Sequence, residues 1–337
     1  MKITARAPVR ISFCGGGTDL AAYYEEHGGI VLSAAIDKYS HVELMSRDDG
    51  KIEISSPDYV QRIIGEVGQQ FLYDNNLDLL KAAINFIRPK KGFSLTTYQD
   101  IPSASGLGTS ASMAVAALGV LFRFDERQIN KSYIAEDAYF LEGLIGSITG
   151  KQDQYAASYG GINIFEFPKK SEGDRIKRTK INLNAEQERE FLDHLLLINI
   201  GGAHISGDLQ KSLVVKMQHR IPDTMIGLDG LKRSTYRMTD YLRQQQWQEF
   251  GEALHQAFIL KKMSNQKVSN QHIEVVYALA RQHGALGGKI SGAGGSGNLL
   301  LFSFPEKKAE ILRVLEDVGG KNIPFDFDED GLVVEEG

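Results

Sequence analysis

The sequence has little cysteine, no excess of basic residues and no long apolar segment. Its single cysteine, Cys14, cannot form an internal disulfide. Lys and Arg total 38 against 43 Asp and Glu, a formal net charge of −5, so no basic excess can hold a nucleic-acid backbone. No apolar run approaches the roughly 20 residues of a membrane helix, and the first residues, MKITARAPVR, lack the apolar core of a signal peptide. We therefore expect a cytoplasmic protein that binds neither nucleic acid nor membrane.

Length and composition are those of an ordinary globular chain. The 337 residues suggest two domains, and 42% hydrophobic with 24% charged residues argues against disordered, collagen-like and coiled-coil classes. Glycine is the exception, because 35 glycines exceed the roughly 24 expected at the usual frequency.

The glycines gather in three clusters, at residues 14–19, 105–110 and 291–297. Glycine permits positive φ angles and close approach of the backbone to a ligand. Taken singly, each cluster is typical of a tight turn. Taken together, they indicate three loops that converge on something small.

Periodicity predicts alternating strands and helices of an α+β chain. Expected strands cover residues 3–13, 29–45 (as one strand or two), 92–98, 194–200 and 298–304. Expected helices cover residues 77–87, 112–122, 132–145, 226–263, 273–283 and 306–318. The helix at 112–122 is too apolar for a surface helix, so we expect it to be buried. The polar segment 168–184 is the best candidate for a domain boundary, giving domains 1–180 and 181–337.

The common phosphate-binding motifs do not fit. Residues 292–297 match the dinucleotide fingerprint by letter, but a strand rather than a helix follows them. No Gly-Lys pair is followed by Ser or Thr, which excludes a Walker A loop, and the protein-kinase signatures are absent.

The second cluster nevertheless suits a polyphosphate. Small residues before a helix N-terminus expose N–H groups to an anion, and the helix dipole adds positive charge. The predicted loop consists of Pro102, Ser103, Ala104, Ser105, Gly106, Leu107, Gly108, Thr109 and Ser110. Thr109 and Ser110 add hydroxyls for phosphate or a metal ion. The alternative, a serine cap on a buried helix, accounts for one hydroxyl but not for the whole run.

Two carboxylates further along the chain suit phosphoryl transfer. Glu142 lies on the next predicted helix, and Asp153 follows a loop with two more glycines. Transfer from ATP needs an oxygen ligand for Mg²⁺ and, in many enzymes, a carboxylate that accepts the hydroxyl proton. We assign the first role to Glu142 and the second to Asp153, against the alternatives of a surface glutamate and a turn-forming aspartate.

At this point the motifs resemble those of the GHMP small-molecule kinases. The resemblance is carried by Ala7-Pro-Val-Arg10 with Thr18-Asp19, by residues 102–111 and by residues 289–295, in the family's order over almost the whole chain. It implies a domain like ribosomal protein S5 followed by a ferredoxin-like domain. It also implies ATP on the 102–110 loop, Mg²⁺ on Ser110 and Glu142, and Asp153 as the base, with Arg10 beside it.

The first motif is similar to that of the heptose 7-phosphate kinases. Galactokinases carry Glu-His where this chain has Gly16-Gly17, so the resemblance disfavours a plain galactokinase. It implies phosphorylation of the anomeric hydroxyl of D-glycero-D-manno-heptose 7-phosphate, on the route to GDP-heptose for surface polysaccharide. The implied substrate-binding residues are Gly16, Gly17, Thr18, Asp19, Lys38, Gly292, Ala293 and Gly294. Asp19 would bind sugar hydroxyls.

The partner of the 7-phosphate and the exact activity stay open. Lys38, Lys151 and His41 are the candidate cations, and nothing in the sequence chooses among them. The alternatives are a fucokinase- or galactokinase-type enzyme, a catalytically silent sensor of sugar and ATP, and a dinucleotide oxidoreductase. The sequence does not give the oligomeric state.

Overall fold

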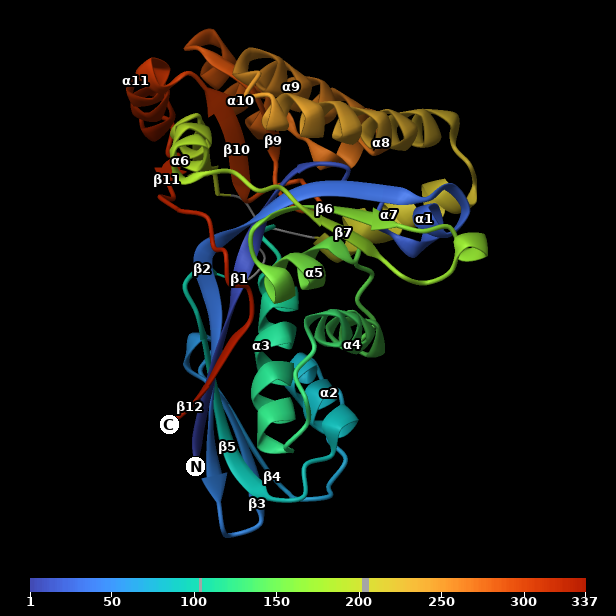
Figure 1. Ribbon diagram of the computed structural model, residues 1–337, viewed down its shortest axis with the longest axis vertical. Coiled ribbons are helices and arrows are strands. Elements are labelled where there is room, and N and C mark those ends of the chain that lie inside the picture. The colour runs from blue at the N-terminus through green and yellow to red at the C-terminus, as the bar shows by residue number, and fades with distance from the viewer. Residues whose placement is uncertain (103–104, 202–205) are drawn as a thin grey trace.

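The strands of the chain form two β-sheets (Figure 1). The structure, a computed structural model, describes residues 1–102, 105–201 and 206–337. Within these residues the larger sheet has eight strands and the smaller sheet four. The larger sheet contains β1 (Lys2–Cys14), β2 (Gly29–Arg47), β3 (Lys51–Ser56), β4 (Gln61–Glu66), β5 (Gly92–Gln99), β6 (Ile162–Phe167), β7 (Lys177–Lys180) and β12 (Val333–Glu336). The smaller contains β8 (Leu195–Asn199), β9 (Ala285–Ile290), β10 (Asn298–Ser303) and β11 (Lys321–Asn322).

Helices cover both sheets. They are α1 (Ala21–His27), α2 (Asp78–Ile87), α3 (Thr109–Phe124), α4 (Lys131–Leu144), α5 (Gln152–Tyr159), α6 (Ala185–Asp193), α7 (Ser206–Gln218), α8 (Pro222–Arg243), α9 (Trp247–Ser264), α10 (Gln271–Gln282) and α11 (Pro305–Glu316). Figure 1 shows α2, α3 and α4 beside the larger sheet, and α8 to α11 around the smaller sheet at the other end. The α+β class predicted from the sequence is confirmed.

The long strand β2 joins two parts of the larger sheet. Its first residues, 29–34, pair with β6, and its last residues, 40–47, pair with β5. β1 runs antiparallel to β2 along most of its length. The 29–45 segment is therefore one strand. It pairs with β1 along most of its length and links the β5 side of the sheet to the β6 side.

Helix α3 forms the centre of the first core, as its apolar sequence predicted. Nearly all of its residues are buried, and it packs against β1, β2, α2 and α4. Gly108 caps its N-terminus with a φ of 81°, in the left-handed region that suits glycine. A buried helix of this kind holds the preceding glycine loop in one place.

The prediction of one helix over residues 226–263 is wrong, because α8 and α9 are separate helices. Gln245, between them, has a φ of 56°, which breaks the helical path. Glutamine is a good helix former, so this break leaves no signal in the sequence.

The polar segment 168–184 contains β7, which pairs with β6 and extends the larger sheet. The larger sheet also receives β12 from the far end of the chain, paired with β1. The division into domains 1–180 and 181–337 stays a prediction.

Candidate active site

A cavity of about 580 Å³ lies where the three glycine clusters meet. Its lining includes Gly16, Gly17, Gly106, Gly108, Gly292 and Ala293, together with side chains from β1, α4, α5, α7 and α9. The sequence prediction that three distant loops converge is thus confirmed. The third loop connects the antiparallel strands β9 and β10, so the helix that a dinucleotide fingerprint requires does not follow it.

Strand β1 supplies two polar side chains to this cavity. Alternation along the strand places Val9, Ile11 and Phe13 in the core cluster behind it. Arg10 and Ser12, on the opposite face, line the cavity. The strand that carries the core thus also fixes the position of the arginine.

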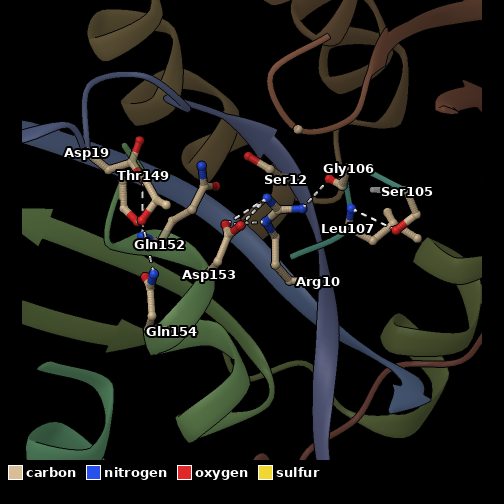
Figure 2. Close-up of polar contacts among 12 residues, drawn as sticks. Arg10, Ser12, Asp19, Ser105, Gly106, Leu107, Thr149, Gln152, Asp153 and Gln154 are labelled. Carbon is tan, nitrogen blue, oxygen red and sulfur yellow. Dashed lines mark hydrogen bonds and ion pairs between the residues drawn. The ribbon is translucent and has the colours of Figure 1, made fainter. Parts of the chain in front are cut away.

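Arg10 and Asp153 form a two-pronged ion pair (Figure 2). Arg10 Nε donates to Asp153 Oδ1 at 2.7 Å, and Arg10 Nη2 donates to Oδ2 at 2.7 Å. The remaining guanidinium nitrogen, Arg10 Nη1, donates to the carbonyl of Gly106 at 2.8 Å. A buried guanidinium with this geometry holds the carboxylate in one orientation beside the glycine loop.

The second and third glycine loops contact each other through their backbones. A Cβ atom on Gly106 would lie 2.9 Å from the Ser291 carbonyl oxygen, and one on Gly292 would lie 2.6 Å from Gly106 Cα. The N–H of Arg10 donates to the carbonyl of Leu107 at 2.9 Å. Only glycine permits this approach at residues 106 and 292.

Only part of the predicted ATP-phosphate loop lines the cavity in the described residues. Gly106, Gly108, Thr109 and Ser110 line the cavity, whereas Pro102, Ser105 and Leu107 are not among its lining residues. Ser103 and Ala104 fall outside the described residues.

Glu142 is a buried carboxylate in contact with Ser110. Burial raises its pKa to about 7, although hydrogen bonds from Ser110, Gln154 and Thr149 oppose the shift. A divalent cation would stabilise the charged form of such a carboxylate. The described residues contain no group of three or more His, Cys, Asp or Glu that could hold a metal ion. The Ser110 hydroxyl and the Glu142 carboxylate are oxygen ligands of the kind that Mg²⁺ takes, because this ion uses few protein ligands beside phosphate oxygens and water.

The first glycine loop presents Asp19 to the cavity. Its carboxylate accepts N–H bonds from Gly17 at 2.8 Å and from Gln152 at 3.1 Å. A Cβ on Gly150 would lie 1.9 Å from Asp19 Oδ2, so glycine is required there. Burial and the neighbouring Asp153 raise the pKa of Asp19.

The structure does not bring three of the predicted substrate-binding residues to the cavity lining. The Thr18 hydroxyl donates to the carbonyls of Gly15 and Ile30, which is a structural role in the loop. Gly294 lies against the backbone of Val268 instead.

Lys38 is the third. A register shift between β1 and β2 places Asp37 and Lys38 at a bulge, and the Lys38 ammonium donates to Asp37 Oδ1 at 2.9 Å. The two other candidate cations lie outside the lining as well. Lys151 Nζ binds Glu136 at 2.7 Å, and His41 Nε2 lies 3.2 Å from Asp100.

The cavity lining also contains residues to which the sequence analysis gave no role, among them Ser12, Gln152, Lys261 and Lys289. The Ser12 hydroxyl and Gln152 Oε1 are buried without a hydrogen-bond partner among the described residues, and both side chains lie on one side of the Arg10–Asp153 pair (Figure 2). Lys261 left a signal, because it continues the helical spacing of buried Leu254, Ala257 and Phe258. A lysine on an apolar stripe is unusual and indicates a special environment.

We expect Glu142→Gln to raise the Mg²⁺ concentration needed for half-maximal rate, because the amide keeps the size of the side chain but removes its charge. Ser110→Ala should raise it less, since water can replace a hydroxyl ligand. Rate measured against Mg²⁺ at saturating ATP checks both variants.

The metal-free melting temperature is the control for this pair. It should not fall in Glu142→Gln, because that variant removes a buried charge that burial destabilises. Wild-type metal titrations in both variants would contradict the assignment.

The chain matches two family models and full-length relatives. The model for the GHMP kinases N terminal domain matches residues 77–161, and that for the GHMP kinases C terminal matches residues 238–321. A D-glycero-alpha-D-manno-heptose 7-phosphate kinase of Campylobacter jejuni is 31% identical over 98% of both chains. A mevalonate kinase of Thermococcus sibiricus is 23% identical over 100% of this chain and 99% of its own.

Solved structures share the fold of this chain. A D-glycero-D-manno-heptose 1-phosphate kinase from Bacteroides thetaiotaomicron has a TM-score of 0.82 at 26% identity, covering 99% of each chain. A galactokinase of Lactococcus lactis, at 18% identity and a TM-score of 0.79, shares the fold over 99% of this chain and 95% of its own. No helix in the described ranges has both the length and the apolar character to cross a membrane.

Proposed function

Because the chain belongs to the GHMP kinases and is an ATP-dependent sugar kinase, we propose that it phosphorylates the anomeric hydroxyl of D-glycero-D-manno-heptose 7-phosphate to give the 1,7-bisphosphate. The observation that carries this proposal is the acceptor wall of the cavity. Gly16 and Gly17 stand beside Asp19 there, and the full-length relative that acts on this sugar phosphate supports the choice.

The acceptor wall suits a large polyol. A Cβ on Gly16 would lie 3.3 Å from Gln152 Nε2 and 3.6 Å from Ser12 Oγ, so glycine keeps the wall open between two polar side chains. The unpartnered oxygens of Ser12 and Gln152 and the carboxylate of Asp19 can bond sugar hydroxyls. A wider pocket with these groups fits a seven-carbon sugar better than a close-fitting hexose site.

Asp153 is proposed to accept the acceptor's hydroxyl proton. Its carboxylate lies at the first turn of α5, and Arg10 holds both oxygens. As the proton moves to Asp153, the acceptor oxygen bonds to the γ-phosphorus of ATP and the bond to the β-phosphate oxygen breaks, releasing ADP. Arg10 would orient the base and stabilise charge on the transferring group.

The glycine loop and α4 are proposed to hold ATP and the metal. Backbone N–H groups between Gly106 and Ser110, at the N-terminus of α3, would bind the phosphates. Mg²⁺ on Ser110 and Glu142 would offset negative charge on the phosphates as the bond breaks. Ser110 lies on α3 and Glu142 on α4, so the packing of these two helices would bring the two metal ligands together.

A substrate panel with Mg-ATP tests the proposal. ADP release should be fastest with heptose 7-phosphate and slower with unphosphorylated heptose, heptose 1-phosphate, mannose, fucose, galactose and mevalonate. A preference for fucose or galactose would favour the second candidate, a fucokinase- or galactokinase-type enzyme. A bifunctional fucokinase/GDP-fucose pyrophosphorylase of Arabidopsis thaliana, 25% identical over 92% of this chain and 31% of its own length, supports that candidate. That outcome would overturn the substrate and leave the kinase chemistry in place.

A further inference from the structure

Two buried lysines at the back of the cavity have no assigned role. Lys261, on α9, is 9% exposed, and Lys289, on β9, is 3% exposed. Both side chains line the cavity. They reach it from the second half of the chain.

Neither ammonium forms an ion pair with a carboxylate of the described residues. Lys261 Nζ donates to the carbonyls of Ile290 at 3.2 Å and Gly292 at 2.5 Å, and Lys289 Nζ donates to the carbonyl of Ser12 at 2.7 Å. An ammonium has three donors. At least one N–H on Lys261 and two on Lys289 therefore remain available to a ligand.

Burial and nearby cations disfavour the charged form of both lysines. Burial, the other lysine and Arg10 lower the pKa of Lys261, and burial together with Arg10 lowers that of Lys289 to about 8. Buried cations without an anion destabilise a fold. A bound anion would satisfy the free donors and offset the repulsion, which is typical of a phosphate site.

The position of the lysines favours the acceptor over ATP. The ATP phosphates are proposed to lie on the Gly106–Ser110 loop, beside Glu142. Lys289 instead binds the backbone of Ser12, whose hydroxyl belongs to the acceptor wall, and Asp19 and Arg10 are charged neighbours of both lysines. Lys261 binds the carbonyl of Gly292, at the point where the third loop touches Gly106. From this placement we propose that Lys261 and Lys289 form an anion subsite that binds the phosphate already present on the acceptor. The inference rests on the proposed function and supplies the cation that Lys38, Lys151 and His41 do not.

Lys261→Met tests the subsite, because methionine keeps much of the apolar stem and removes the charge. On heptose 7-phosphate, kcat/KM should fall roughly ten- to a hundredfold, as expected for loss of a charge-assisted hydrogen bond. The low rate on unphosphorylated heptose and the KM for ATP should change less than about twofold, within the effect of a group that makes no contact. Lys289→Met should give the same pattern.

Lys262→Met is the matched control. Lys262 is the next residue on α9, and its ammonium binds Glu274 away from the cavity at 2.9 Å. This variant should keep wild-type constants for both acceptors. An equal loss on phosphorylated and unphosphorylated heptose in Lys261→Met, or a raised KM for ATP, would overturn the subsite.

A binding measurement separates this inference from the proposed function. With Mg-ADP at saturation, heptose 7-phosphate should raise the melting temperature of the wild type more than heptose does, and Lys261→Met should lose that difference. If the wild type binds heptose 7-phosphate in this way but does not phosphorylate it, the proposed function fails and the subsite stands. If the phosphate adds nothing to binding by the wild type, the subsite is wrong.

Discussion

Asp153→Asn is expected to lower kcat by roughly 10²–10⁴-fold, the usual range for loss of a general base. The amide keeps the size of the side chain and one oxygen for Arg10, but it cannot take the proton of the acceptor. The KM for ATP should barely change, because Asp153 lies beside the loop and is not proposed to hold the phosphates. Steady-state rates at saturating ATP and acceptor check the result.

Asp240→Asn, at a position 65% exposed on α8, is the control for the aspartate-to-asparagine change itself and should keep wild-type rates. Wild-type turnover in Asp153→Asn would remove this residue from the mechanism.

Arg10→Met should lower kcat by roughly 10²–10³-fold, as expected when a preorganised charge is removed from a transition state. The substitution leaves Asp153 without its two bonds and the carbonyl of Gly106 without its donor. Arg10→Lys should recover only part of the rate, because an ammonium keeps the charge but not the planar fork. Rates and melting temperatures of both variants separate a catalytic loss from unfolding.

The double variant, Arg10→Met with Asp153→Asn, shows whether the two residues act as a unit. Residues in direct contact are commonly non-additive, so the combined loss in kcat should be clearly smaller than the product of the single losses. If the loss in kcat of the double variant equals the product of the two single losses, Arg10 does not act by orienting Asp153.

The sequence predicted those parts of the site that local patterns control. Alternation around Ile11 identified the strand that carries Arg10, and the apolar run after Ser110 identified the buried helix. The three glycine clusters were predicted to meet, and they line one cavity. The strand and helix patterns lie within a few residues of the side chains that they position, whereas the meeting of the three clusters was inferred from their shared composition.

The parts that were missed depend on contacts between distant segments. The bulge that turns Lys38 toward Asp37 arises from the register between β1 and β2, which no single segment specifies. The short helix α5, which carries Asp153, has little apolar periodicity of its own. Lys261 enters the cavity only because α9 packs beside β9. Long-range packing, rather than local propensity, decides such positions.

The pairing of β12 with β1 orders events during synthesis of the chain. The strand that completes one edge of the larger sheet is made after the other strands of that sheet, because Val333–Glu336 pair with Arg6–Ile3. Until those residues leave the ribosome, β1 exposes unpaired backbone groups along that edge, and such edges invite association with other chains. The nascent chain must therefore keep this edge from wrong partners until β12 covers it.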